Sequence, residues 1–140
     1  MKMPKKIENN MLAPCGMHCT VCYVHLAMRK SGKRCQGCLN IDEGKPEHCR
    51  RCKIKTCAQS KGHTRCLECE DFPCKLVKNL ERSYNKRYDE SLVANSQCAL
   101  EQGVERFLEM DRIKRTCPCG GAISMHDKEC SECKKDYKIE

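Results

Sequence analysis

The sequence predicts a small, metal-stabilised and mostly α-helical fold, with irregular cysteine-rich loops and a C-terminal β zinc ribbon. Cysteine supplies 16 of the 140 residues, whereas aromatic residues make up only 4% and Trp is absent. The remaining apolar residues are too few to outweigh a chain entropy of roughly 1–2 kcal/mol per residue. Small chains with such thin cores are usually stapled by disulfides or by metal ions.

The spacing of the cysteines favours metal over disulfides. Pairs separated by two residues recur along the chain, and this spacing lets two thiolates bind one ion. The pairs are Cys19/Cys22, Cys35/Cys38, Cys49/Cys52, Cys66/Cys69 and Cys130/Cys133. The N-terminus has no apolar stretch of signal-peptide length, and no run approaches the ~20 apolar residues of a membrane span. We therefore expect a cytoplasmic protein outside any membrane, in which thiols stay reduced and can bind metal.

The formal net charge of +8 does not by itself indicate a nucleic-acid partner. That value counts every cysteine as neutral, whereas metal-bound cysteines are thiolates. A zinc ion with four thiolates is anionic overall, so several such sites would cancel most of the positive charge. We therefore interpret the excess of Lys and Arg mainly as compensation for the metal centres.

Cysteine density divides the chain into four segments. They are a polar tail (1–14), a Cys-rich metal-binding module (15–80), a helical segment (81–116) and the zinc ribbon (117–140). Within the module we expect three helices. One starts near Cys19 and stops before Gly32, one covers residues 49–60, and one starts near Pro73 and runs through Leu80.

The helical segment carries apolar residues at helical spacing. They are Leu92, Val93, Leu100, Val104, Phe107 and Leu108. Asp89 is the expected N-cap, and Gly103 is the position where the helix is expected to break. We expect the apolar stripe to pack into the core, and the alternative is a partner-binding helix. Cys98 has no paired cysteine and is expected to be a small buried hydrophobe.

The C-terminal cysteines have the spacing of a ribbon. They lie in two ligand turns, Cys117-Pro-Cys119-Gly-Gly and Cys130-Ser-Glu-Cys133. Such turns place four sulfurs about 2.3 Å from one zinc ion. Four protein ligands leave no open coordination position, so we predict a structural zinc site. Ile123 and Tyr137 are expected to shield it, and His126 is expected to be a nearby loop residue and not a ligand.

Eight cysteines of the module form two further sets of four in sequence order. The first set is Cys35, Cys38, Cys49 and Cys52, and the second is Cys57, Cys66, Cys69 and Cys74. Each set is expected to bind one ion, most simply zinc. An interleaved grouping, in which alternate pairs share ions, fits the same spacings and stays open.

Cys15, Cys19 and Cys22 remain, and three thiolates need a fourth ligand. His25 lies three residues after Cys22, so on a helix it would face the same ion. The alternative ligands are His18, His48 and His63. The other interpretation is an iron–sulfur cluster with one open iron. An iron–sulfur redox or cluster-carrying protein is therefore the alternative function.

No enzyme motif is recognisable, since the sequence lacks a P-loop, a dinucleotide-binding glycine pattern and a His-Glu-x-x-His motif. We therefore favour a non-enzymatic, multi-zinc protein that acts as an interaction or adaptor module with a protein partner. A third hypothesis is nucleic-acid binding through the ribbon and the basic stretches at 33–34, 50–51 and 112–115. The scarcity of aromatic residues argues against stacking on single strands.

The cysteine pattern also resembles a known family. The motifs that carry the resemblance are Ala13-Pro-Cys-Gly16 with Cys19 and Cys22, Cys35-x-Gly-Cys38, Cys49-x2-Cys52-x-Ile-x2-Cys57-Ala with Lys61-Gly62, and Cys66-x2-Cys69-x2-Phe-Pro-Cys74. Over about residues 13–80 they resemble the cysteine-rich family called domain of unknown function 3795. The resemblance implies a small bacterial or archaeal protein that binds metal and has no established activity. Longer members are similar in the helical stretch and the terminal ribbon.

Overall fold

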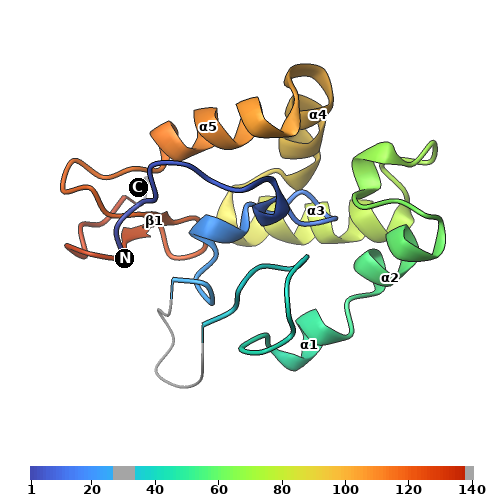
Figure 1. The fold of residues 1–140 in the computed structure, drawn as a ribbon, viewed down its shortest axis with the longest axis horizontal. Helices are drawn as coiled ribbons and strands as arrows, with labels where there is room; N and C mark the ends of the chain where they lie inside the picture. The colour runs from blue at the N-terminus through green and yellow to red at the C-terminus, as the bar shows by residue number, and fades with distance from the viewer. Residues whose placement is uncertain (27–33, 138–140) are drawn as a thin grey trace.

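The computed structural model describes residues 1–26 and 34–137, and helices make up most of the regular structure (Figure 1). The α-helices are α1 (Glu47–Arg50), α2 (Lys53–Ser60), α3 (Lys75–Tyr88), α4 (Leu92–Gln102) and α5 (Val104–Lys114). Short 3-10 helices cover Asn9–Met11, Cys19–Val21 and Cys66–Glu68. Strands β1 (Ile123–Ser124) and β2 (Glu129–Cys130) form an antiparallel sheet near the C-terminus. The mostly helical class is confirmed, and no helix of the described residues could span a membrane.

Helix α4 packs against both α3 and α5. Ser91 caps α4, because its Oγ accepts a hydrogen bond of 3.0 Å from the Ala94 N–H. The prediction that Asp89 caps this helix is wrong: Asp89 has a positive φ of 54° and ends α3, where its N–H donates to the Asn85 carbonyl. Gly103, at a φ of 95°, separates α4 from α5 and confirms the expected break.

The helix expected from Cys19 is wrong in its described part. Only Cys19–Val21 is helical, as a 3-10 turn, and Cys22 is extended with φ −75° and ψ 133°. The Cys22 sulfur accepts backbone N–H bonds from Val24 and His25, and this turn around the sulfur replaces the continued helix. The rest of the expected helix, residues 27–31, lies outside the described residues.

The other two module helices differ from the prediction at their ends. Residues 49–60 contribute to two helices, because the chain is extended at Cys52 (ψ 114°), between α1 and α2. Helix α3 begins at Lys75, runs through Leu80 as expected, and continues to Tyr88. A cysteine occupies the N-cap position in both cases, Cys52 for α2 and Cys74 for α3. Two candidate metal ligands therefore lie where helices start.

The N-terminal segment, expected to be a polar tail, packs along the ribbon and the helices. The Met3 N–H donates to the Gly120 carbonyl, and the Met1 carbonyl accepts from the Ala122 N–H, both at 2.9 Å. Figure 1 accordingly shows the N-terminus beside the C-terminal sheet. Leu12 is fully buried in a core cluster with residues of α4 and α5. The segment therefore ties the ribbon to the helical core.

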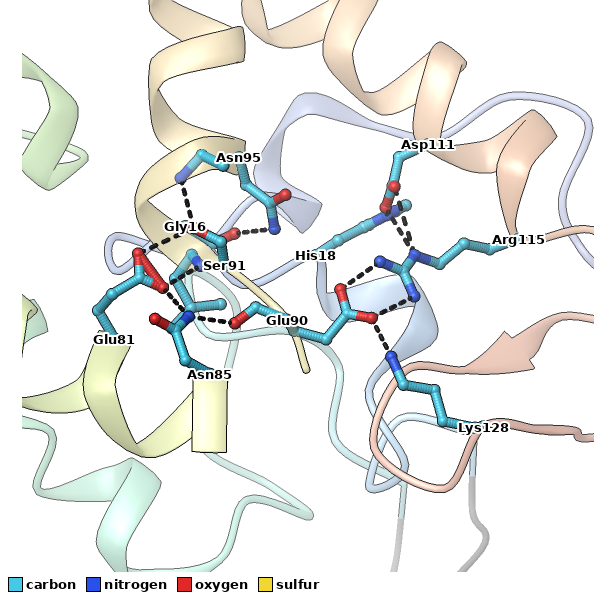
Figure 2. Close-up of polar contacts among 12 residues, drawn as sticks. Gly16, His18, Glu81, Asn85, Glu90, Ser91, Asn95, Asp111, Arg115 and Lys128 are labelled. Atoms are coloured by element: carbon cyan, nitrogen blue, oxygen red, sulfur yellow. Dashed lines mark hydrogen bonds and ion pairs between the residues drawn. The ribbon is translucent and has the colours of Figure 1, made fainter. Parts of the chain in front are cut away.

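A buried polar network joins the N-terminal segment, α5, the turn between α3 and α4, and the ribbon (Figure 2). His18 Nδ1 lies 2.7 Å from Asp111 Oδ2. Arg115 Nη2 lies 2.5 Å from Glu90 Oε1, and Glu90 also pairs with Lys128 between the two strands. Burial alone would raise the pKa of Glu90, but Arg115 and Lys128 hold it below its usual value. Glu90 is therefore an ionised carboxylate at neutral pH.

Substituting Glu90→Gln should destabilise the protein, because Arg115 and Lys128 lose their shared carboxylate. Glu90 is only 10% exposed and Arg115 only 8%, so we expect a loss of about 3 kcal/mol in the free energy of unfolding, as for other broken buried pairs. Urea unfolding of the metal-loaded protein measures this loss. The exposed Glu101→Gln is the control and should stay within about 0.5 kcal/mol of wild type.

The difference in stability between wild type and Glu90→Gln should also depend on pH. Because the native pKa of Glu90 is lowered, the ionised side chain stabilises the fold at pH values above its unfolded pKa of 4.5. This contribution is lost as the pH falls through the native pKa. The difference between wild type and Glu90→Gln should therefore shrink below pH 4.5. A difference that is small at neutral pH, or that grows on acidification, would contradict the ionised network.

Candidate metal centres

The four ribbon cysteines converge on one point. Their sulfurs all lie within 4.8 Å of one another. Cys117 Sγ is 3.7 Å from Cys133 Sγ, and Cys119 Sγ is 3.5 Å from Cys130 Sγ. Four sulfurs about 2.3 Å from a tetrahedral ion are separated by nearly this distance. The ribbon therefore has the geometry of a site for a metal ion.

Backbone amides support the ribbon sulfurs. The Gly121 N–H donates to Cys119 Sγ and the Glu132 N–H to Cys130 Sγ, both at 3.4 Å. Gly121 is required by close approach, because a Cβ there would lie 2.7 Å from Cys130 Sγ. The β1–β2 pairing sets Cys130 opposite Ile123, which is buried beside the site as expected. The hairpin and its glycine together hold the two ligand turns face to face.

Tyr137 does more than shield the ribbon site. Its hydroxyl donates a 2.8 Å hydrogen bond to Cys117 Sγ and thereby lowers the pKa of Cys117 to about 6. A thiol with this pKa is largely ionised at neutral pH and ready to bind a cation. The sequence predicted only an apolar, shielding role for Tyr137. The signal that could have indicated more is its position four residues after Cys133.

The second sequence-order set lies around a small cavity. Cys57 of α2, Cys66 and Cys69 of the following turn, and Cys74 at the start of α3 all line this space of about 20 Å³. The volume is about that of one water-sized sphere. His63 lines the same cavity. Four thiols, and one histidine beside them, thus surround a space suited to a single ion.

A cation that lines this cavity lies close to one of its sulfurs. Lys61 Nζ lies 3.7 Å from Cys69 Sγ. The negative charges of Cys69 and Cys57 raise the pKa of Lys61, so the ammonium is retained. Lys61 can therefore donate to a metal-bound thiolate at the edge of this site.

The other module cysteines are not grouped in sequence order. Five of them line one larger cavity of about 690 Å³. They are Cys15, Cys22, Cys38, Cys49 and Cys52. Cys35, which sequence order places with Cys38, does not line this cavity, whereas Cys15 and Cys22 do. The cavity therefore takes one cysteine from each of the pairs Cys19/Cys22 and Cys35/Cys38, which is neither the sequential grouping nor one in which whole alternate pairs share an ion.

Cys19 and Cys35 flank this cavity. The Cys38 N–H donates to Cys19 Sγ, and the Gly37 N–H donates to Cys35 Sγ, both at 3.4 Å. The turn at Cys35 repeats the amide-to-sulfur bonding of the ribbon, and Gly37 permits it with a φ of 107°. The first half of the module therefore gathers seven thiols, and backbone amides support the sulfurs of Cys19 and Cys35 in the way typical of metal ligands.

His25 has the tautomer expected of a metal ligand, although it lines neither of the two cysteine cavities. Its Nδ1 lies 2.6 Å from the Cys35 carbonyl oxygen, which can only accept, so Nδ1 carries the proton and Nε2 has the lone pair. Metal-binding histidines usually make such a bond with the other ring nitrogen. Burial lowers the pKa of His25, so the ring is neutral at pH 7. The turn at Cys22, and not the expected helix, brings it beside Cys35.

The remaining candidate residues have other surroundings. His18 bonds Asp111 in the buried network and lines none of the cysteine cavities described above. The side chain of His48 lies outside the part of the chain that the structure describes. Cys98 is half-buried against the apolar cluster of α4 and α5 and shows the hydrophobic role expected of it. The ring of His126, in the ribbon hairpin, packs between Tyr23 and the tyrosines of α3.

Burial makes most thiols of the larger cavity hard to ionise. It raises the pKa of Cys22 to about 11 and that of Cys49 to about 12. Cys38 shifts in the other direction, because a hydrogen bond with Cys19 lowers its pKa to about 7. A cation must therefore displace protons from these thiols when it binds.

Residues 11–79 match the sequence model of a family described as "Protein of unknown function (DUF3795)". The match assigns residues 11–79 to the DUF3795 family. The match contains eleven of the sixteen cysteines, including every cysteine that lines the two cavities, and it ends before α4, α5 and the ribbon. No curated protein and no solved structure matches the chain. We call residues 11–79 the DUF3795 module.

Substituting Tyr137→Phe should weaken the ribbon site without removing a ligand. The loss of the hydroxyl raises the pKa of Cys117, so protons compete better with the ion at neutral pH. We expect a loss of roughly tenfold in metal affinity, as for other groups that hydrogen-bond a metal ligand. Competition with a chromophoric chelator measures the affinity.

The effect should shrink at alkaline pH, where Cys117 is ionised in both proteins. Tyr88→Phe, which removes a hydroxyl but keeps the ring that packs on His126, is the matched control. Equal affinities for wild type and Tyr137→Phe at pH 7 would contradict the proposed role of the hydroxyl.

Proposed function

We propose that the protein is a zinc-binding interaction module, in which the ribbon and the small cavity each hold one zinc ion through four thiolates. The observation that carries the proposal is the convergence of the four ribbon sulfurs, with separations of 3.5 and 3.7 Å. Tetrahedral coordination by thiolates is the preferred environment of structural zinc. With four protein ligands, neither ion has a position for a substrate, so both serve the fold.

The energetics support a structural role for these ions. Structural zinc contributes about 10–16 kcal/mol of binding free energy in small peptides at neutral pH, comparable with the total stability of a domain. The ribbon has only two short strands, β1 and β2, to stabilise it. Its fold therefore depends on the ion more than on the sheet.

A protein is the partner we favour. Met110 and Ile113 lie one turn apart on α5 and are 43% and 63% exposed, and Leu100 of α4 is 61% exposed. Apolar side chains on an outer helix face suit contact with another protein better than contact with a charged nucleic acid. In this proposal the metal ions set the positions of the helices, and α5 meets the partner.

Elemental analysis of protein purified without oxygen tests the metal assignment. We expect at least two zinc ions per chain. Cys69→Ser/Cys74→Ser should lose one of them and Cys130→Ser/Cys133→Ser another, whereas Cys98→Ser should lose none. Fewer than two metal ions per chain in the wild type would contradict the proposed function.

Affinity capture from the source cells tests the partner. Wild type should retain a protein that Met110→Ser/Ile113→Ser does not, and nuclease treatment should leave that protein bound. Arg106→Ser, also exposed on α5, is the matched control and should capture as wild type does. Equal capture by the double variant, or loss of binding with nuclease, would contradict a protein partner on α5.

A further inference from the structure

The larger cavity of the DUF3795 module differs from the ribbon in the spacing of its thiols. The four cysteines of the small cavity line a space of only about 20 Å³, and the sulfurs of the ribbon lie within 4.8 Å of one another. The five cysteines of the larger cavity instead line a space of about 690 Å³. One tetrahedral ion would have to draw its sulfurs together to the distances seen in the ribbon. The geometry therefore suits an occupant larger than one ion.

The charges around this cavity favour an anionic occupant. Arg51, Lys53, Lys55 and Arg87 all line it. No Asp or Glu is among its described lining residues, although Glu47, outside the lining, pairs with Arg51. Thiolates on the wall add negative charge that these cations can offset. A metal–sulfur cluster bound by several thiolates is anionic and meets both conditions.

Aromatic side chains also line the cavity. Tyr84 and Tyr88 of α3 line it together with His126 from the ribbon hairpin. The His126 ring lies 5.6 Å from Tyr84 and 4.7 Å from Tyr88, and Tyr84 Oη is 3.1 Å from His126 Nε2. Burial by protein and restricted solvent access are among the factors that set the potential of a metal–sulfur cluster. The ribbon thus contributes a side chain to a cavity of the DUF3795 module.

We propose that the larger cavity binds a polynuclear iron–sulfur cluster through four of its five cysteines. The proposal rests on the proposed metal-binding function, and it assigns this cavity a different metal from the ribbon. Protein-bound clusters of this kind are held by four cysteine thiolates. Bridging sulfide ions spread the thiolates over a larger volume than one zinc ion does. Each cysteine thiol releases its proton to solvent as its sulfur bonds iron.

The test is anaerobic reconstitution of the full chain with ferrous iron and sulfide, followed by absorption spectroscopy, electron paramagnetic resonance and metal analysis. We expect a coloured protein with iron and acid-labile sulfide in equal amounts, a paramagnetic signal that appears or disappears on reduction, and zinc retained elsewhere. A colourless protein with zinc in place of iron would overturn the proposal and leave the zinc-binding function standing. A protein with fewer than two metal ions of any kind would overturn both.

Variants locate the cluster. Cys49→Ser/Cys52→Ser leaves three thiols on the wall, so it should lose the colour and the iron while the ribbon keeps its zinc. Cys98→Ser is the matched control and should reconstitute as wild type does. A double variant that keeps the full absorption and iron content would overturn the location. If the double variant does not fold, Cys15→Ser/Cys22→Ser, which also leaves three thiols on the wall, replaces it, and full iron content in that variant would also overturn the assignment.

Discussion

Thiolates packed side by side repel one another, and the rest of this structure depends on how that repulsion is offset. Seven cysteines lie together in the first half of the DUF3795 module, and burial together with neighbouring sulfurs raises the pKa of thiols such as Cys49. A cation that binds several sulfurs removes both the repulsion and the cost of burial. This constraint accounts for where two helices start, because α2 and α3 each begin beside a cysteine. The chain between them bends to bring sulfurs together.

The ribbon and the module are joined by polar contacts and by packing. Glu90, in the turn between α3 and α4, binds Arg115 of α5 and Lys128 of the ribbon at once. His126 reaches from the ribbon hairpin to the aromatic wall of the larger cavity. The N-terminal segment adds backbone hydrogen bonds to Gly120 and Ala122. Loss of order at the ribbon would therefore reach the wall of the module cavity.

The spacing of residues predicted those features that are formed by residues close together in the sequence. The ribbon cysteines, the set at Cys57, Cys66, Cys69 and Cys74, and the break at Gly103 all lie where the spacing placed them. The helix from Cys19 could not be excluded from the sequence, because its end depends on amide bonds to the Cys22 sulfur. The grouping around the larger cavity also escaped prediction, since it joins cysteines that are distant in the chain. The role of Tyr137 needed the hairpin geometry that brings its hydroxyl to Cys117.

The central claim is that metal ions, and not the small apolar core, hold this fold. Hydrogen exchange of the reduced chain, measured before and after metal removal by a chelator under argon, tests it most directly. If metal ions hold the fold, amides of the ribbon and of α2 should lose their protection from exchange as the metal leaves, and regain it when metal is restored. Unchanged protection of these amides in the metal-free, reduced protein would contradict it.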